Sequence, residues 1–227
     1  MRASGAKRLR SCAFGAAALA SATVAAAQST NVAPDLSTGA ADFDPAKAPG
    51  LAREAKAAYA SAAAKLRSGD VKGLILAASP EGDVWTLNVA TKRMADYNAA
   101  DSARQALEIC EFQAGKPCAI LSVNGYETRR APGEPPKPQP VLSNRPSDFD
   151  ATRLPFVPAS KRAAAAAYVA AKGPRAFAVT TSGLWLWRSG ANAPEAIART
   201  MADCAEAFKP AGCVLYAVGS RVVFGAE

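Results

Sequence analysis

Hydrophobic and polar positions follow two similar series along this chain. In the first series, apolar residues at helical spacing predict a helix over residues 51–67. Short apolar or alternating runs then predict strands over 73–78 and 84–89. A second helix is predicted over 98–112, and a closing strand over 118–123.

The second series has the same order of elements. An alanine-rich helix is predicted over 160–172 and two strands over 175–179 and 184–187. A helix over 192–204 and a strand over 213–218 complete it. Helix, strand, strand, helix and strand therefore occur twice, in the same order.

The two series also match residue by residue near their ends. Each closing helix starts at an asparagine followed three residues later by an acid, and each ends near a cysteine. The closing strands read Cys-Ala-Ile-Leu-Ser-Val and Cys-Val-Leu-Tyr-Ala-Val. We therefore predict an α+β fold of two tandem α-β-β-α-β units. The hairpin in each unit favours largely antiparallel sheets, and we expect the helices to pack on one face.

The segments outside these units have different compositions. Residues 1–27 have a basic start, an apolar run from Ala13 to Val24 and three alanines before Gln28, which is typical of a secretory signal peptide. The apolar run is shorter than the roughly 20 residues of a spanning helix. We expect no transmembrane segment after cleavage, and a periplasmic or secreted location. The predicted segments are a signal peptide (1–27), a disordered arm (28–50), the first unit (51–130), a proline-rich linker (131–158) and the second unit (159–227).

Four cysteines follow the predicted signal peptide. An even number of cysteines in an exported protein favours disulfide bonds. Of the three possible connectivities, the simplest joins the two cysteines within each unit, Cys110 with Cys118 and Cys204 with Cys213. A redox or metal-binding pair is the alternative, although such pairs commonly have the closer Cys-x-x-Cys spacing.

Composition excludes several kinds of chemistry. The chain has no histidine, so Ser-His-Asp and Cys-His catalysis and His-ligated metal sites are excluded. We predict no metal, no cofactor and no catalytic residue. The net charge is +8, but the first 27 residues hold four basic side chains and no acidic one, which leaves +4 for the rest. This weak excess does not predict nucleic-acid binding.

Trp185, Trp187 and Arg175 are the candidate ligand-binding residues. The two tryptophans alternate along one predicted strand, so both rings point to the same face of the sheet. Such a pair could stack on a sugar ring or hold a peptide. The alternative is that the rings fill the core between sheet and helices, where alanine leaves space.

The second series resembles a C-terminal signature of small secreted bacterial proteins. The matching residues are Arg175-Ala-Phe-Ala, Gly183-Leu-Trp-Leu-Trp, Cys204, Cys213-Val-Leu-Tyr-Ala-Val and Val222-Val-Phe. Some proteins with this signature have names that refer to 5-aminolevulinate synthase. A pyridoxal-phosphate enzyme of that kind needs a larger two-domain subunit with a Schiff-base lysine, which this chain does not offer. The resemblance implies no active-site residue.

Three functional hypotheses remain open. The first is a non-enzymatic periplasmic or secreted protein, a binding or envelope-associated module whose partner is an envelope protein or a cell-wall glycan. The second is a cell-wall or glycan hydrolase that uses a carboxylate pair, Glu195 with Asp203 or Glu206. Facing acids in a cleft beside Trp185 or Trp187 would support the hydrolase. The third is a secreted inhibitor of a hydrolase.

Overall fold

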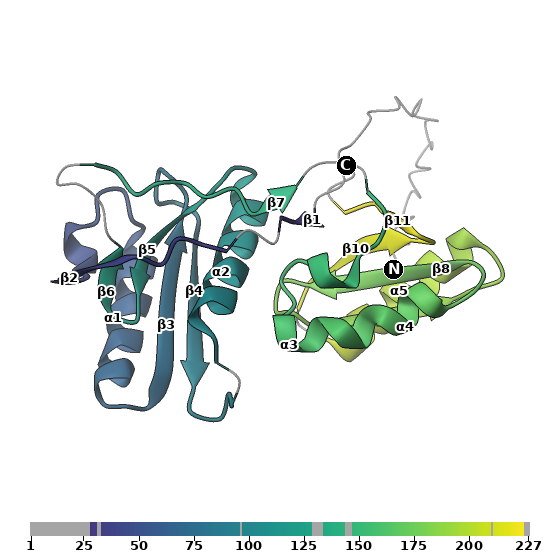
Figure 1. Cartoon of the computed structure of the whole chain (residues 1–227), viewed down its shortest axis with the longest axis horizontal. Coiled ribbons are helices and arrows are strands. Elements are labelled where there is room, and N and C mark those ends of the chain that lie inside the picture. The colour runs from purple at the N-terminus through teal and green to yellow at the C-terminus, as the bar shows by residue number, and fades with distance from the viewer. Residues whose placement is uncertain are drawn as a thin grey trace, which may run out of the picture.

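The computed structural model shows a mixed α+β protein with two units (Figure 1). It describes residues 28–30, 33–95, 97–128, 134–143, 147–209 and 211–224. The predicted signal peptide, residues 1–27, lies outside the described residues. Within them, no helix is long and apolar enough to cross a membrane.

The first unit is built on a five-stranded antiparallel sheet. Its strands lie in the order β2-β6-β5-β3-β4. The elements are β2 (Thr38–Asp42), η1 (Pro45–Lys47), α1 (Arg53–Arg67), β3 (Val71–Ala78), β4 (Trp85–Thr91), α2 (Ala99–Ala114), β5 (Ala119–Val123) and β6 (Tyr126–Thr128).

The second unit is built on a four-stranded antiparallel sheet in the order β11-β10-β8-β9. Its elements are η2 (Ala151–Arg153), α3 (Ala159–Arg162), η3 (Ala163–Ala165), α4 (Ala166–Ala170), β8 (Arg175–Thr180), β9 (Trp185–Ser189), α5 (Ala193–Ala207), β10 (Cys213–Val218) and β11 (Arg221–Val222). The predicted helix over 160–172 is therefore divided by one 3₁₀ turn. Apolar periodicity cannot distinguish this turn from an α turn, because the two differ only in which carbonyl the amide bonds.

The duplication extends to an irregularity in the sheets. The order β6-β5-β3-β4 of the first unit is the order β11-β10-β8-β9 of the second. In both closing strands the pairing skips the third residue after the cysteine, which is Leu121 in β5 and Tyr216 in β10. This shared bulge confirms the two tandem units that the sequence predicts.

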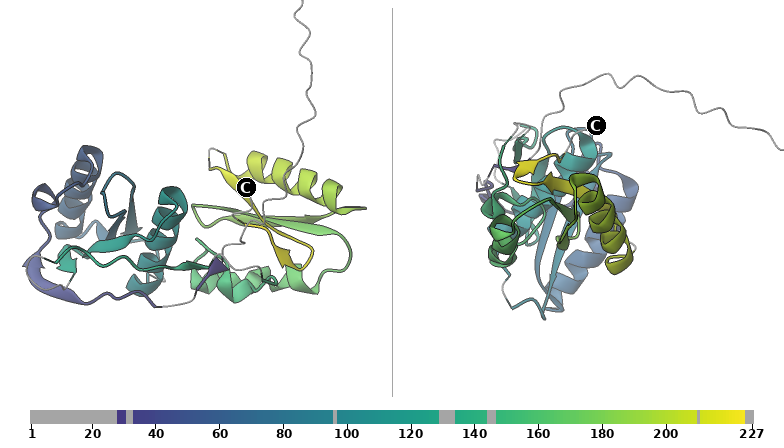
Figure 2. Two further views of the ribbon diagram at one scale, coloured as in Figure 1. Left: turned by 90° about the horizontal axis from the view of Figure 1, so that it is seen from above. Right: turned by 90° about the vertical axis from the view of Figure 1, so that its right-hand side faces the viewer.

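We expected the helices to pack on one face of each sheet, but they cover both faces. In β3, Leu74 and Leu76 contact α1, whereas Ile75 and Ala77 contact α2. In the second unit, α5 and α4 likewise lie on opposite faces (Figure 2). The physical reason is that β3 and β8 are apolar at successive positions, so both faces of each central strand need cover.

The predicted arm and linker are also more structured than we expected. In the arm, β1 (Gln28–Ser29) pairs with β7 (Leu142–Ser143), and β2 pairs with β6. In the linker, Leu154, Phe156 and Val157 are buried in the core of the second unit. These segments lack an alternating apolar pattern, because their order comes from partners far away in the sequence.

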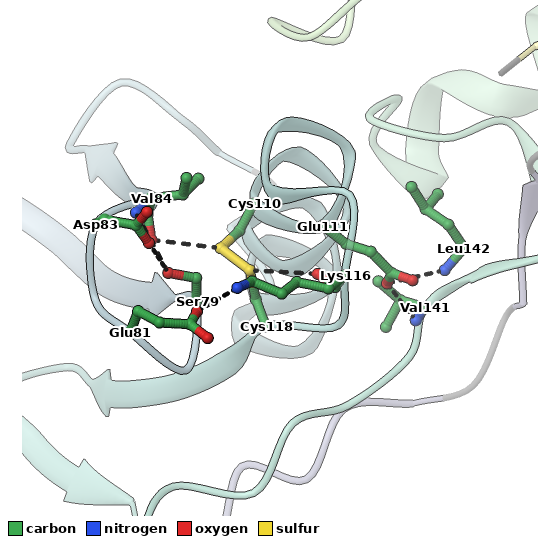
Figure 3. Close-up of a disulfide and its surroundings, with 10 residues drawn as sticks. All are labelled: Ser79, Glu81, Asp83, Val84, Cys110, Glu111, Lys116, Cys118, Val141 and Leu142. Atoms are coloured by element: carbon green, nitrogen blue, oxygen red, sulfur yellow. Dashed lines mark hydrogen bonds and ion pairs between the residues drawn. A yellow bond between two sulfur atoms is a disulfide. The ribbon is translucent and has the colours of Figure 1, made fainter. Parts of the chain in front are cut away.

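Both predicted disulfides are present. Cys110 bonds Cys118 and Cys204 bonds Cys213, with Cα–Cα distances of 6.0 and 6.1 Å. Each bond ties the last turns of a helix to the start of the next strand, as Figure 3 shows for the first unit. The simplest connectivity is therefore confirmed.

Helix α2 lies between the two units (Figure 1). One of its faces packs on the first sheet, and another carries a buried charge cluster that contacts the second unit. Arg104 pairs with Glu108 at 2.5 Å and donates to the Val157 carbonyl at 2.9 Å. Glu108 also accepts the Phe156 amide at 2.6 Å. Charged bonds buried in this way orient one unit on the other.

Phe156, which lies at this contact between the two units, has an unusual backbone conformation. Its φ of 65° is in the left-handed region, which is unfavourable for a side chain with a Cβ. The Glu108 carboxylate holds its amide, and its ring packs edge-on against Phe112 of α2, with centroids 5.6 Å apart. The strained backbone is therefore held by contacts from the first unit.

Candidate functional site

The three predicted ligand-binding residues lie together on the α4 face of the second sheet. Trp185 stacks on Phe177 with ring centroids 5.2 Å apart, and Trp187 meets the Tyr168 ring edge-on at 5.9 Å. Arg175 places its guanidinium carbon 5.1 Å from the centroid of the same Tyr168 ring. Both tryptophans are half-buried and pack against the core of the unit. Whether their exposed edges bind a ligand stays a prediction.

Tyr168 is the centre of this aromatic group. Burial raises the pKa of its hydroxyl to about 12, and the charge of Arg175 opposes this rise only in part. The hydroxyl has no hydrogen-bond partner among the described residues. The group is therefore a packed apolar layer.

The acids of the hydrolase hypothesis lie elsewhere. Glu195 pairs with Arg199 at 3.7 Å, and Asp203 pairs with Arg188 at 2.5 Å. Glu206 is exposed on the same helix, α5. Because α5 covers the face of the sheet opposite α4, these acids do not face Trp185 or Trp187 across a cleft.

A cavity of about 710 Å³ opens instead in the first unit. We call it the acid-rimmed cavity. Its apolar side is formed by buried residues of the sheet and of the segment before α1. These residues are Phe43, Leu51, Ala78, Ala119 and Leu121. Leu121 is the bulge residue of β5, so the irregularity of that strand lies at the cavity wall.

Carboxylates also line this cavity. Asp42, Asp44, Glu127 and Glu134 line it, with Lys47 as the basic residue among the lining positions. Lys47 lies 3.6 Å from Asp44, and both side chains are exposed. The described residues that line the cavity therefore carry an excess of negative charge, although the chain as a whole is basic.

Prolines and a pair of glycines shape the rim. Pro49, Pro80, Pro135, Pro136 and Pro138 line the cavity, and proline fixes the backbone angle φ at each of these positions. Gly50 and Gly82 both have positive φ. A Cβ on Gly82 would lie 2.6 Å from the Gly50 carbonyl, so the two segments approach more closely than any other residue allows. The bond from the Ala52 amide to the Gly82 carbonyl, 3.0 Å long, fixes this approach.

The turn over residues 79–84, which includes Gly82, is also fixed by contacts of its own side chains (Figure 3). The Ser79 hydroxyl donates to Asp83 at 2.7 Å, which lowers the pKa of that carboxyl. Glu81 pairs with Lys116, two residues before Cys118. The disulfide therefore lies beside the turn that forms one wall of the cavity.

The described residues offer little for metal or thiol chemistry. No group of three or more histidine, cysteine or acidic side chains in this part of the chain could hold a metal ion. The four cysteines that follow the predicted signal peptide are all in disulfides. A cavity with an apolar wall and a charged rim is suited to binding by shape and charge.

Sequence reasoning missed this cavity for a physical reason. Its rim comes from the predicted arm and linker, which we expected to be disordered or extended. Two signals were present, the apolar residue Phe43 in the otherwise polar and proline-rich arm and Leu51 directly after the arm. Both are buried, and the Phe43 ring meets Tyr59 at 4.9 Å.

Comparison with protein-family models, curated proteins and solved structures finds no match to this chain.

Proposed function

We propose that this chain is an exported, non-enzymatic binding protein that takes its ligand in the acid-rimmed cavity. The observation that carries the proposal is the cavity itself. Its volume of about 710 Å³ falls within the range of roughly 300–1,000 Å³ that is common for ligand sites. Its apolar wall can exclude water, and its rim carboxylates can orient a ligand.

Export is supported by residues 1–27, which have the pattern of a secretory signal peptide. The two disulfides are compatible with an oxidising compartment, the periplasm or the extracellular space. In that location the ligand would come from the envelope or the medium. Fractionation of cells that express the full chain tests this part, and retention of an uncleaved chain in the cytoplasm would contradict it.

Binding is tested on the mature chain, residues 28–227, labelled with ¹⁵N. The panel consists of basic, acidic and neutral heptapeptides and soluble cell-wall glycan fragments. We expect at least one member to shift the amide signals of residues that line the cavity. The proposal is wrong if the panel shifts none of them, or if the shifts gather around Trp185 and Trp187.

A pair of variants makes this test specific. Ala41→Trp places a large ring on an exposed position of the cavity rim, and Ala205→Trp does the same on the exposed face of α5. We expect Ala41→Trp to weaken binding and Ala205→Trp to leave it unchanged. Equal binding by both variants would place the ligand outside the cavity.

A further inference from the structure

The charge of the rim restricts which ligands the acid-rimmed cavity can accept. Among the described residues that line it, four are carboxylates and one is a lysine, which lies beside Asp44. An anionic ligand would be repelled by these carboxylates, whereas a cationic group would be attracted to them.

The strand beside the cavity offers a way to bind an extended chain. β2 is the last strand of its sheet, and among the described strands only β6 pairs with it. Its sequence, Thr-Gly-Ala-Ala-Asp, contains no lysine and no proline, the residues that commonly protect an edge strand from pairing. Ala41 and Asp42, at its end, line the cavity. The edge of β2 that no described strand covers and the carboxylates that line the cavity are therefore adjacent.

We propose that the ligand is an extended peptide segment with lysine or arginine side chains, which adds to the edge of β2 as a further strand. Its backbone pairs with β2, and its basic side chains reach Asp42 and Glu134, which both line the cavity. Its apolar side chains alternate with the basic ones and point to the opposite face of the extended sheet. Main-chain hydrogen bonds supply affinity in this mode, and the cavity supplies the preference for basic residues. This inference rests on the proposed function.

The first test compares peptides by fluorescence anisotropy on the mature chain. The probe is a labelled heptapeptide in which lysine alternates with valine, and its counterpart has glutamate in place of lysine. We expect the basic peptide to bind at least about tenfold more tightly, with weaker binding as salt rises. Equal affinity of the two peptides would overturn the inference.

The second test changes the protein. Asp42→Asn and Glu134→Gln together remove two rim carboxylates. Glu54→Gln and Glu206→Gln remove the same charge from exposed positions outside the cavity. We expect about a fivefold loss for the rim variant, or two- to threefold per carboxylate, and less than twofold for the control. Similar losses in both would mean that only net charge matters, which would overturn the site.

The third test separates strand pairing from charge alone. The basic peptide methylated on alternate backbone nitrogens keeps its charges but loses half of its donors. We expect it to bind at least about tenfold more weakly, and spermidine to compete poorly. Unchanged binding would exclude pairing with β2. Sedimentation that shows a dimer, with Ala41→Trp abolishing it, would make a second copy the occupant and overturn the inference as well.

The two levels of the proposal fail separately. If only neutral peptides or glycan fragments shift the signals of the cavity, the cavity is a binding site and the inference of a basic peptide is wrong. If no member of the panel shifts them, the proposed function fails together with the inference.

Discussion

Two tyrosines occupy the same place in the two units, in the helix before the first strand, but their hydroxyl groups meet different partners. The Tyr59 hydroxyl lies 2.7 Å from the Ser122 hydroxyl in a buried position. The Tyr168 hydroxyl is buried and, in the part of the chain that the structure describes, has no hydrogen-bond partner. The position that corresponds to Ser122 in the second unit is Ala217, because each pairs with the matching residue of the central strand. The second unit therefore has no side-chain hydroxyl at this position.

This difference predicts unequal effects of the same change. Tyr59→Phe should lower the free energy of unfolding by about 1–2 kcal/mol, since it leaves the buried Ser122 hydroxyl without its partner. Tyr168→Phe should change it by less than about 0.5 kcal/mol or raise it, because no hydrogen bond is lost. Urea unfolding of both variants measures this. Equal losses would show that the Tyr168 hydroxyl has a partner in solution.

Tyr168 also predicts a dependence on alkaline pH. Burial raises the pKa of its hydroxyl from the ordinary value of 10.0 to about 12. Between these values the unfolded chain loses the proton and the folded chain keeps it, so stability should fall as pH rises from about 10 to about 12. Urea midpoints measured at several alkaline pH values should fall less steeply in Tyr168→Phe than in the wild type. Identical slopes would contradict the raised pKa.

At the scale of the elements, each unit is tied by a disulfide between a helix and the following strand. The sequence separations are 8 and 9 residues, so the two bonds restrict the unfolded chain to a similar degree. The surroundings differ, because Cys110, Cys118 and Cys204 are buried and Cys213 is half-buried. Alanine is therefore the better replacement, since it adds no buried hydroxyl group.

Removal of either disulfide should cost a similar amount. We expect the double variants Cys110→Ala/Cys118→Ala and Cys204→Ala/Cys213→Ala each to lose about 2–3 kcal/mol of unfolding free energy. Thermal unfolding of the oxidised proteins compares them with the wild type. An unchanged melting temperature in either variant would show that its disulfide does not stabilise the unit.

At the scale of the whole molecule, the two units are joined through a buried charge cluster on α2. Burial raises the pKa of the Glu108 carboxyl, and the Arg104 guanidinium opposes that rise. Arg162 of the second unit lies 3.9 Å from the same carboxylate. Because removing one member of a buried ion pair leaves the other without compensation, this joint is sensitive to single substitutions.

A matched pair of arginines tests the joint. Arg104→Met should cost about 3–5 kcal/mol, since Glu108 would remain buried without its closest cation. Arg199→Met removes the exposed pair with Glu195 on α5 and should cost less than about 1 kcal/mol. Urea unfolding at neutral pH measures both.

The same variant has a pH signature with a definite sign. In Arg104→Met the pKa of Glu108 should rise further, so the folded chain binds a proton that the unfolded chain releases. Stability lost at neutral pH should therefore return in part as pH falls toward the ordinary carboxyl value of 4.5. A loss that is constant with pH would show that Glu108 does not cause it.

The sequence by itself determined the two α-β-β-α-β units, their antiparallel hairpins and their disulfides. These features depend on contacts between neighbours along the chain. The caps at Asn98 and Asn192, the apolar runs and the short spacing of Cys110 from Cys118 are all local. Local patterns are readable because each needs only a few adjacent residues to specify it.

Only the tertiary structure decided which face each helix covers, how the units are joined and where the cavity lies. The central strands are apolar on both faces, so the sequence did not show that α1 and α2 lie on opposite sides. Glu108 and Phe156 are 48 residues apart, and β2 is held by β6. Such contacts have no local pattern, because partners distant in the sequence order the polar and proline-rich segments that form the cavity rim.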